Sequence, residues 1–568
     1  MPSAPELSVR RAWCLAVLIA ALFFAAVAPT LHWLEFTSGN ENIVVQTALE
    51  MRHGGPKLLP KLLGEPRVKK PPLVAWLTAA AMRPATIEEL DQPKQREAAY
   101  HDLAFQARWP ALLAAAAMVL ATFEFARVWG GPRVGLAAAM VVCTSYLFLK
   151  YMRQSTTDAH LAAWVAVANA CLLHGLLRGR WWVAGLGGGA AIGVAFMCKG
   201  PVALVETAVP AIAVAAVLQN GAYARGGDLN RPPLKCLYLP ISVGVTLFLV
   251  IALPWFIYVL KSTPGVASTW SSEVSREGAT NLEVGNPLTY LLLGPTTAPW
   301  IVFAAAGLLL LWQRRRDRSA WVPFIFSVAP LLVMVWFRDR KERYMLPMIM
   351  PAAVICGYGI VQWMKSWSTG RTKTDWLLLA LHLFVVLTIG LGLCAGGATA
   401  LKRVDGTPWL PTHLAVWAGV AVVLSVAIVL ILTRRVAWAM PGGTFVVMLG
   451  VLALFLFGYR ESGDGKSPLK PLADAIIDRA PDAVIFDWLP RGRADEQIAI
   501  YLNRTILKQD PAMLRPVDRS IALIARQAKQ DPEPNYALPW LPVATAKEGA
   551  TTWYAYVAPK RGRVSHQR

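Results

Sequence analysis

Apolar segments long enough to cross a bilayer recur along the chain, from Trp13 to Phe457. A transmembrane helix needs about 20 consecutive, mostly apolar residues. The pattern therefore predicts a polytopic α-helical membrane protein with about thirteen spans. They are expected at 13–32, 110–126, 134–150, 157–177, 181–197, 201–218, 237–260, 287–312, 320–337, 344–364, 376–397, 413–432 and 437–458.

The first polar interruption, residues 33–108, is too long for a simple connection between two spans. It contains an amphipathic stretch at 43–51 and the apolar stretch 71–77 with Trp76. Both stretches are expected to form helices that lie at the membrane interface. We assign this loop to a transmembrane domain that covers residues 1–458.

The second polar region is the C-terminal tail, residues 459–568. Residues 483–486 have the apolar, β-branched character of a strand, and residues 496–502 have the pattern of a helix. The tail is therefore predicted to form a small α/β domain.

Composition supports membrane residence and indicates an anionic partner. Of the 568 residues, 55% are hydrophobic and 16% are charged, which excludes a disordered chain or an ordinary soluble protein. The net charge of +21 fits anionic lipids or a phosphate-bearing substrate, and in a membrane protein these are favoured over nucleic acid. The seven cysteines lie in apolar stretches without the spacing of metal ligands.

The distribution of Lys and Arg predicts the orientation in the membrane. Alternate short loops are rich in basic residues, including the run at 314–316, and such loops face the cytoplasm. The N-terminus is then inside, and the loop 33–108 lies outside. An odd number of spans also places the tail outside.

Several ionisable residues on the predicted outer side break this charge asymmetry. Such groups at span ends are costly unless they are solvated, paired or bound to a ligand. Converging cations suit the phosphate of a lipid-linked substrate, and a nearby carboxylate could act as a general base. The residues are Asn40 with Glu41, Lys69, Lys70, Arg153, Asp158, Lys199, Arg276 and the cluster 338–343 before Tyr344.

Each of these residues also has a simpler interpretation. The Lys199 ammonium could extend to the lipid headgroups, and Arg153 could form an ordinary surface ion pair with Asp158. The cluster 338–343 could neutralise itself, with Tyr344 as an aromatic anchor at the interface.

The chain carries local motifs in a recognisable order. They are 48–51 (ALEM), 63–66 (LGEP), 70–73 (KPPL), Arg153 five residues before Asp158, 199–201 (KGP) and 343–347 (RYMLP). With these motifs the chain resembles the bacterial aminoarabinose transferases and the related protein O-mannosyltransferase-like enzymes, which are membrane glycosyltransferases of the GT-C fold. The resemblance covers residues 13–460.

The resemblance implies a function and a location. Members of the family transfer a sugar from a polyprenyl phosphate donor to a lipid or protein acceptor at the periplasmic face of the inner membrane. By resemblance, Lys70, Arg276 and Tyr344 contact the donor phosphate, while Lys199 and Asp158 line the same cavity. Arg343, Arg153 and Lys69 complete the expected substrate-binding set. The reaction needs no nucleotide or soluble cofactor.

Two positions depart from the family pattern. Asn40 stands where the family has its expected catalytic Asp, and an amide cannot accept a proton as a carboxylate does. Lys69 replaces an acidic residue, which removes a possible ligand for a divalent metal, so no metal site is predicted. The general base is then Glu41 or Asp158, with Glu41 ranked first because Arg153 would make Asp158 a weaker base. Alternatively, the chain has altered chemistry or has lost transfer activity.

Two further functional classes remain open at this stage. A transporter or flippase for a phosphorylated lipid would also need outer cations, and Glu206 lies within an apolar span. A catalytically silent lipid-binding member would be consistent with Asn40.

Overall fold

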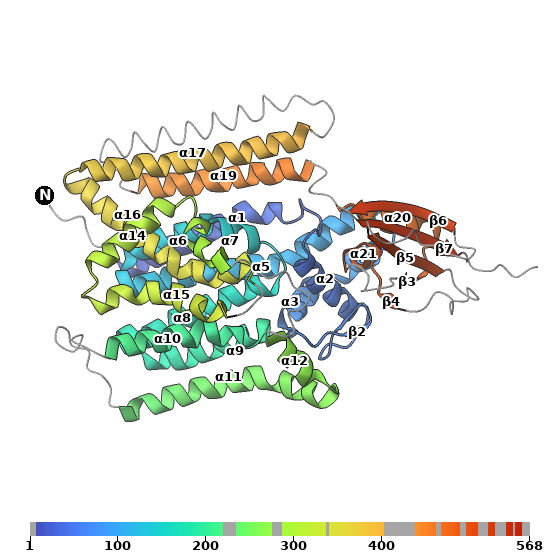
Figure 1. Cartoon of the computed structure of the whole chain (residues 1–568), viewed down its shortest axis with the longest axis horizontal. Helices are drawn as coiled ribbons and strands as arrows, with labels where there is room; N and C mark the ends of the chain where they lie inside the picture. The colour runs from blue at the N-terminus through green and yellow to red at the C-terminus, as the bar shows by residue number, and fades with distance from the viewer. Residues whose placement is uncertain are drawn as a thin grey trace, which may run out of the picture. The chain divides into compact units, whose positions relative to one another are not determined.

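A computed structural model gives the architecture of the chain (Figure 1). The contacts divide the chain into two units, which we describe separately. The helical unit comprises Met1–Thr30, Lys69–Leu73 and Ala111–Gly458, and the mixed unit comprises Leu31–Val68, Val74–Pro110 and Tyr459–Arg568. The structure describes residues 7–219, 234–274, 287–336, 340–402, 438–461, 467–488, 496–508, 521–528, 541–548 and 551–558.

The helical unit is built from apolar helices. They are α1 (Val9–Val27), η1 (Ala28–Thr30), the second part of α5 (Arg96–Gly130), α6 (Pro132–Thr144), α7 (Tyr146–Tyr151), α8 (Thr157–Arg178), η2 (Val183–Gly188), α9 (Gly189–Lys199), α10 (Val202–Gln219), α11 (Leu234–Ser262), α12 (Val266–Val274), η5 (Pro287–Leu292), α13 (Leu293–Thr296), α14 (Ile301–Gln313), η6 (Arg318–Trp321), α15 (Val322–Met334), η7 (Glu342–Met348), α16 (Ile349–Thr369), α17 (Lys373–Lys402) and α19 (Ala439–Glu461).

Helix α16 lies at the centre of this unit, with α6, α14 and α15 packed against it. Small residues permit the close approach: a Cβ on Gly359 would lie 2.6 Å from the carbonyl oxygen of Phe303 on α14, and one on Gly357 would lie 2.8 Å from the backbone nitrogen of Ala138 on α6. Glycine at such contacts is typical of helix packing in membranes.

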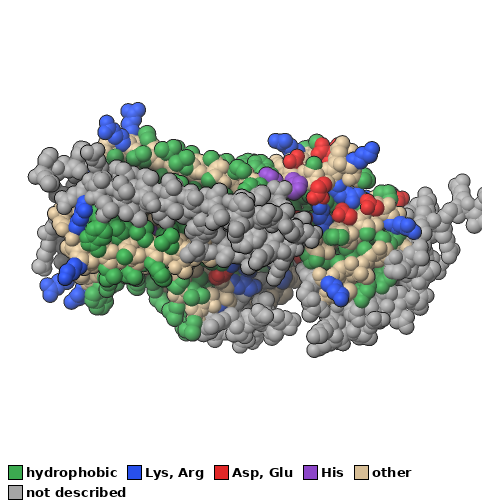
Figure 2. Space-filling model, turned by 90° about the horizontal axis from the view of Figure 1, so that it is seen from above, with side chains coloured by type: hydrophobic (Ala, Val, Ile, Leu, Met, Phe, Trp, Pro, Cys, Tyr) green, Lys and Arg blue, Asp and Glu red, His purple; other side chains and the backbone are tan. Residues whose placement is uncertain are grey.

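Six of the described helices are long and apolar enough to cross a membrane, or seven if one bent pair counts as a single span. The other predicted spans lie mainly on helix in the described part of the chain, while the span predicted at 413–432 lies outside the described residues. The total of thirteen therefore stays a prediction. Figure 2 shows that hydrophobic side chains make up much of the helical unit outside the grey band, and that Lys and Arg side chains lie at its left end.

Three predicted spans need correction. The segment 134–150 is not one helix, because α6 ends at Thr144, the backbone of Ser145 is extended (ψ 136°) and the short helix α7 begins at Tyr146. The segment 287–312 is broken, because Leu288–Thr296 and Ile301–Gln313 meet at an angle of 103°. Pro295 and Pro299 lie at this break and lack the backbone N–H that would continue a helix. The span predicted at 110–126 is only part of α5, a helix of 35 residues that begins at Arg96.

The mixed unit combines the first polar loop with the tail. The loop forms α2 (Gly39–Arg52), β1 (Lys61–Leu62), β2 (Glu65–Pro66), α3 (Leu73–Ala81), α4 (Pro84–Glu89) and the start of α5. The tail forms α20 (Lys470–Arg479), β3 (Val484–Trp488), α21 (Glu496–Leu502), β4 (Ile506–Lys508), β5 (Ile521–Ala528), β6 (Leu541–Glu548) and β7 (Thr551–Ala558).

The strands of the tail form one five-stranded sheet in the order β4-β3-β5-β7-β6. Strand β3 pairs in parallel with β4 and β5, and the other pairs are antiparallel. The strand and the helix predicted in the tail are present as β3 and α21.

One hydrophobic core joins the two sequence segments of the mixed unit. It contains Leu49 and Leu103 from the loop together with Leu469, Ile498 and Trp553 from the tail. The contacts thus group residues 31–68 and 74–110 with the tail, whereas the sequence pattern assigned the loop to the transmembrane domain.

Candidate functional site

The helical unit brings together four of the predicted site residues around one buried carboxylate. Asp158 lies in the first turn of α8, Lys199 is the last residue of α9, and Arg343 and Tyr344 belong to η7. The Lys199 ammonium donates to Asp158 Oδ1, and Arg343 Nε lies 3.2 Å from Asp158 Oδ2. The side chains are only 4% (Asp158), 11% (Lys199) and 15% (Arg343) exposed.

Local sequence explains why these groups meet. The Thr156 side chain caps α8 by accepting from the Ala159 N–H at 3.3 Å, which places Asp158 where the helix dipole stabilises a negative charge. Helix α9 ends at Gly200, whose φ of 74° lies in the left-handed region that favours glycine. Lys199 therefore projects from the end of its helix.

The ring of Tyr344 packs against both cations. Lys199 Nζ lies 4.0 Å from the ring centroid, and the Arg343 guanidinium carbon lies 5.2 Å from it. A cation over an aromatic face is attracted by the ring quadrupole. The interpretation of Lys199 as a side chain extended to the headgroups is therefore wrong, because its ammonium is held between Asp158 and Tyr344.

Lys70 adds a third positive charge, since it interacts electrostatically with Asp158. Arg153 lies nearby in sequence and donates to the carbonyl of Thr30 at 3.4 Å. An exposed ion pair between Arg153 and Asp158 is excluded, because both side chains are buried. Lys69 is exposed.

Glu342 anchors the segment that carries Arg343 and Tyr344. Its carboxylate pairs with the Lys150 ammonium of α7 and accepts a hydrogen bond of 2.7 Å from the Tyr151 hydroxyl. Burial, followed by this hydrogen bond, raises the pKa of Tyr151 to about 12, so the phenol remains a donor at physiological pH.

This anchor corrects one sequence interpretation and adds two residues that the sequence analysis missed. Glu342 is neutralised from α7, so the cluster 338–343 does not simply neutralise itself. Lys150 lies at the end of a predicted span on the outer membrane face, where few cations are expected, so its position could have marked it as a candidate site residue. Tyr151 gave none.

Glu41, the favoured base, lies in the mixed unit and is fully engaged. It is 1% exposed, and its two carboxylate oxygens accept from Arg108 Nε and Nη2, each at 2.8 Å. Arg108 Nη1 also donates to the carbonyls of Leu31 and Leu34 at 2.6 Å. A carboxylate that is buried and has both oxygens paired with one guanidinium is poorly accessible to an acceptor, which argues against Glu41 as the base. Asn40, beside it in α2, is half-buried.

The remaining predictions for the site concern donor contacts and metals. Arg276 lies outside the described residues. Within the described ranges, no group of three or more His, Cys, Asp or Glu side chains could hold a metal ion. Glu206 is buried in α10, and its carboxyl interacts electrostatically with Lys199 and Asp158.

The chain is similar to known membrane glycosyltransferases in sequence and in fold. A family model described as dolichyl-phosphate-mannose-protein mannosyltransferase matches residues 98–258. The chain is 26% identical over 401 residues to an undecaprenyl phosphate-alpha-4-amino-4-deoxy-L-arabinose arabinosyl transferase of Pseudomonas fluorescens; the match covers 68% of this chain and 65% of that relative. A relative with the same activity in its name, from Pseudomonas aeruginosa, is 22% identical, and its match covers 72% of this chain and 75% of the relative.

Solved structures agree on the fold. The crystal structure of ArnT from Cupriavidus metallidurans bound to undecaprenyl phosphate superposes with a TM-score of 0.69 at 16% identity, and the match covers 95% of this chain and 97% of that one. The chain therefore has the fold of the GT-C membrane glycosyltransferases. Together, these findings confirm the resemblance to the aminoarabinose transferases and protein O-mannosyltransferase-like enzymes.

Proposed function

We propose that the chain is a membrane glycosyltransferase that moves a sugar from a polyprenyl phosphate donor, such as undecaprenyl phosphate, to a lipid or protein acceptor. We place the reaction at the periplasmic face of the bacterial inner membrane. The observation that carries the proposal is the surplus of positive charge around Asp158. Lys199 and Arg343 both pair with Asp158, so two buried cationic side chains share one carboxylate.

A buried surplus of cations is costly unless an anion completes it. A phosphate at the headgroup end of a polyprenyl chain would supply that anion. In the transfer, the acceptor nucleophile forms a bond to the anomeric carbon while the bond from that carbon to the phosphate oxygen breaks. The electron pair leaves with the polyprenyl phosphate. Cations placed beforehand stabilise this developing charge most strongly where water is excluded.

The geometry also favours one class of acceptor. Glu41 is closed by Arg108, Asp158 is held by Lys199 and Arg343, and Asn40 cannot accept a proton. A hydroxyl acceptor would need a general base. A phosphate acceptor is already ionised near neutral pH, because its second pKa is about 6. We therefore propose a phosphate-bearing lipid as the acceptor.

The test is transfer by the purified full chain from a radiolabelled polyprenyl phosphate sugar, with the aminoarabinose donor named for the relatives as the first to try. Lys199→Met keeps most of the apolar stem and removes the charge. Losing a charge-assisted hydrogen bond of about 1.5–3 kcal/mol should weaken donor binding by roughly tenfold to a hundredfold. Arg180→Gln removes an exposed charge elsewhere and should leave donor affinity unchanged.

Unchanged donor affinity in Lys199→Met would remove the phosphate-binding role of the cluster. Donor binding without any sugar transfer would instead favour a silent lipid-binding member. Movement of the intact donor across a vesicle membrane, without loss of its sugar, would favour a flippase.

A further inference from the structure

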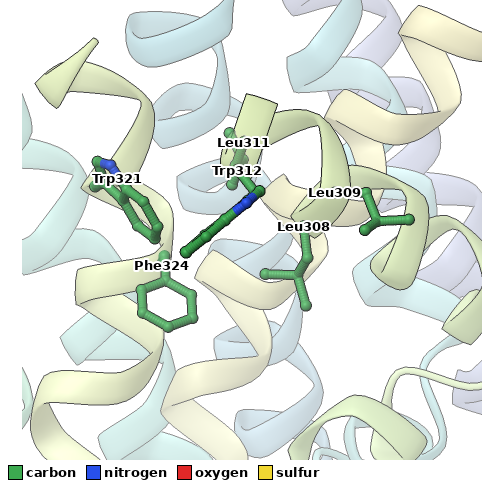
Figure 3. A pocket seen from close by; sticks show the side chains of 6 residues that line it. All are labelled: Leu308, Leu309, Leu311, Trp312, Trp321 and Phe324. Carbon is green, nitrogen blue, oxygen red and sulfur yellow. The ribbon is translucent and has the colours of Figure 1, made fainter. Parts of the chain in front are cut away.

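A shallow apolar groove lies on the helical unit between α14 and the segment formed by η6 and α15 (Figure 3). Its volume is about 350 Å³. Two indole rings frame it, with the centroids of Trp312 and Trp321 6.2 Å apart and the planes at 84°. The lining is entirely hydrophobic: Leu308, Leu309, Leu311, Trp312, Trp321 and Phe324.

In the described part of the chain, side chains that line the groove are exposed at the surface of the helical unit. Leu309 is 65% exposed and Trp312 is 59% exposed. A wall of exposed Leu and Trp on an apolar helix suits a hydrocarbon chain, and Trp is enriched at the boundary between hydrocarbon and headgroups.

A cationic loop adjoins the groove, because Arg315 contacts two of the lining residues, Trp312 and Trp321. The loop joins α14 to η6, and its residues 314–318 include four arginines and one aspartate. Arg314 pairs with Asp317 at 2.6 Å, and the Arg315 guanidinium carbon lies 5.5 Å from the centroid of the Trp312 ring. Arg316 is exposed. Positive charge is therefore held directly beside the aromatic wall.

Local contacts fix the loop on the groove. Trp321 Nε1 donates to the carbonyl of Arg315 at 3.2 Å, and Arg318 Nη1 donates to the carbonyl of Val217 on α10 at 3.1 Å. Trp321 thus lines the groove with its ring and holds the loop with its indole N–H. A residue that lines the apolar groove therefore also positions the cationic loop.

This feature is separate from the Asp158 cluster. Arg314 Nη1 donates to the Tyr358 hydroxyl on α16 at 3.1 Å, whereas Arg343 lies at the beginning of the same apolar helical segment, Glu342–Thr369. Fifteen residues separate the two positions, which corresponds to about 22 Å at 1.5 Å per residue. With a hydrocarbon core about 30 Å thick, the two cationic regions belong to opposite leaflets.

We propose that the groove binds an acyl chain of an anionic glycerophospholipid, whose headgroup phosphate lies on Arg315 and Arg316. The loop is in the leaflet that the positive-inside rule predicts to be cytoplasmic, the opposite side from the donor-binding cluster. A zwitterionic lipid would fill the groove equally well, but it would not use the net positive charge of the loop. The proposal does not rest on the proposed transfer activity.

The test is native mass spectrometry of the delipidated full chain, titrated with dioleoylphosphatidylglycerol or dioleoylphosphatidylcholine. The wild-type chain should bind one phosphatidylglycerol more tightly than the rest and more tightly than phosphatidylcholine. In the double variant Arg315→Gln/Arg316→Gln this affinity should fall roughly thirtyfold, five- to sixfold for each arginine. Arg180→Gln is the matched control, because it removes an exposed arginine from another predicted cytoplasmic loop and should change nothing.

A second variant tests the groove without changing charge. Leu309→Trp enlarges a lining side chain and fills part of the groove at a residue that is already exposed, so the helix should be retained. It should weaken binding of the tight lipid while both arginines remain. Equal binding of the two lipids, an equal loss in Arg180→Gln, or full affinity in both groove variants would overturn the proposal. Displacement of the bound phosphatidylglycerol by undecaprenyl phosphate would also overturn it, because the groove would then be a site for polyprenyl lipids.

Discussion

Replacing Glu41 by Gln distinguishes a structural ion pair from a catalytic base. In the structure the carboxylate is 1% exposed and holds the Arg108 guanidinium through two hydrogen bonds, each 2.8 Å long. Gln keeps the shape but removes the charge, so Arg108 is left buried without its counter-ion. Removing one partner of a buried pair costs about 3–5 kcal/mol. The carbonyls of Leu31 and Leu34 still accept from Arg108, so we expect the lower end, about 3 kcal/mol.

That loss should appear in the thermal unfolding of the purified chain. A change of about 3 kcal/mol corresponds to a fall of roughly 6–12 °C in the unfolding midpoint for a unit of this size. Arg108→Gln should lower the midpoint by a similar amount, and the double variant should be less destabilised than the sum of the two, because the pair acts as one. Transfer per folded molecule, measured well below the transition, should stay near the wild-type value in Glu41→Gln.

The opposite pattern would refute this reasoning. If Glu41→Gln abolished transfer while its unfolding midpoint stayed at the wild-type temperature, Glu41 would be the base after all. If Arg108→Gln also kept its transfer activity while Glu41→Gln lost it, the same conclusion would be stronger, because transfer would then depend on the carboxylate and not on the ion pair.

Three other measurements test the donor anchor, the acceptor and the orientation. Glu342→Gln should loosen the segment that carries Arg343 and weaken donor binding roughly three- to tenfold. Tyr151→Phe should have a smaller effect, because an ordinary hydrogen bond contributes about 0.5–1.5 kcal/mol. Equal donor affinity in the wild-type chain and in both variants would show that this anchor is irrelevant. If the acceptor is a phosphate, the transfer rate should rise through pH of about 6 and then level off, as the second proton leaves the acceptor; a midpoint that shifted in a carboxylate variant would point to a protein base instead. A cysteine at Lys57 should react with a membrane-impermeant thiol reagent in intact spheroplasts and one at Arg316 should not, and the reverse pattern would invert the predicted orientation.

The sequence predicted the helices well because apolar runs must satisfy their backbone hydrogen bonds inside a membrane. It could not predict the bend of 103° within residues 287–312, since hydropathy averages over a window and ignores how two proline-bounded pieces are oriented. It also could not show that the first loop shares a core with the tail. The two segments lie more than 350 residues apart, and each half of that core looks like an ordinary amphipathic surface by itself.

For the site, the predicted sidedness grouped four residues that the structure brings together, Asp158, Lys199, Arg343 and Tyr344, but it did not predict which of them pair. Asp158 was expected to interact with Arg153, five residues away, because sequence distance was the only guide. The structure instead supplies Lys199 from α9 and Arg343 from η7. In the same way, Glu41 was ranked first as the base because Arg153 was expected to weaken Asp158, while no local motif indicated its own partner, Arg108, 67 positions further along the chain. Burial and long-range pairing decide whether a carboxylate is available, and neither can be read from a local motif.

The two carboxylate sites differ in their charge balance, and this difference favours Asp158 over Glu41 as the place of the proposed transfer. Glu41 and Arg108 form a one-to-one pair whose remaining donors reach backbone carbonyls, so the pair needs no further ion. Asp158 is shared by two cations, Lys199 and Arg343, and a buried excess of positive charge is costly unless another anion shares the site. A donor phosphate meets that need directly. An amide at position 40 is then compatible with transfer, provided that the acceptor arrives already ionised and the cations, not a base, lower the barrier.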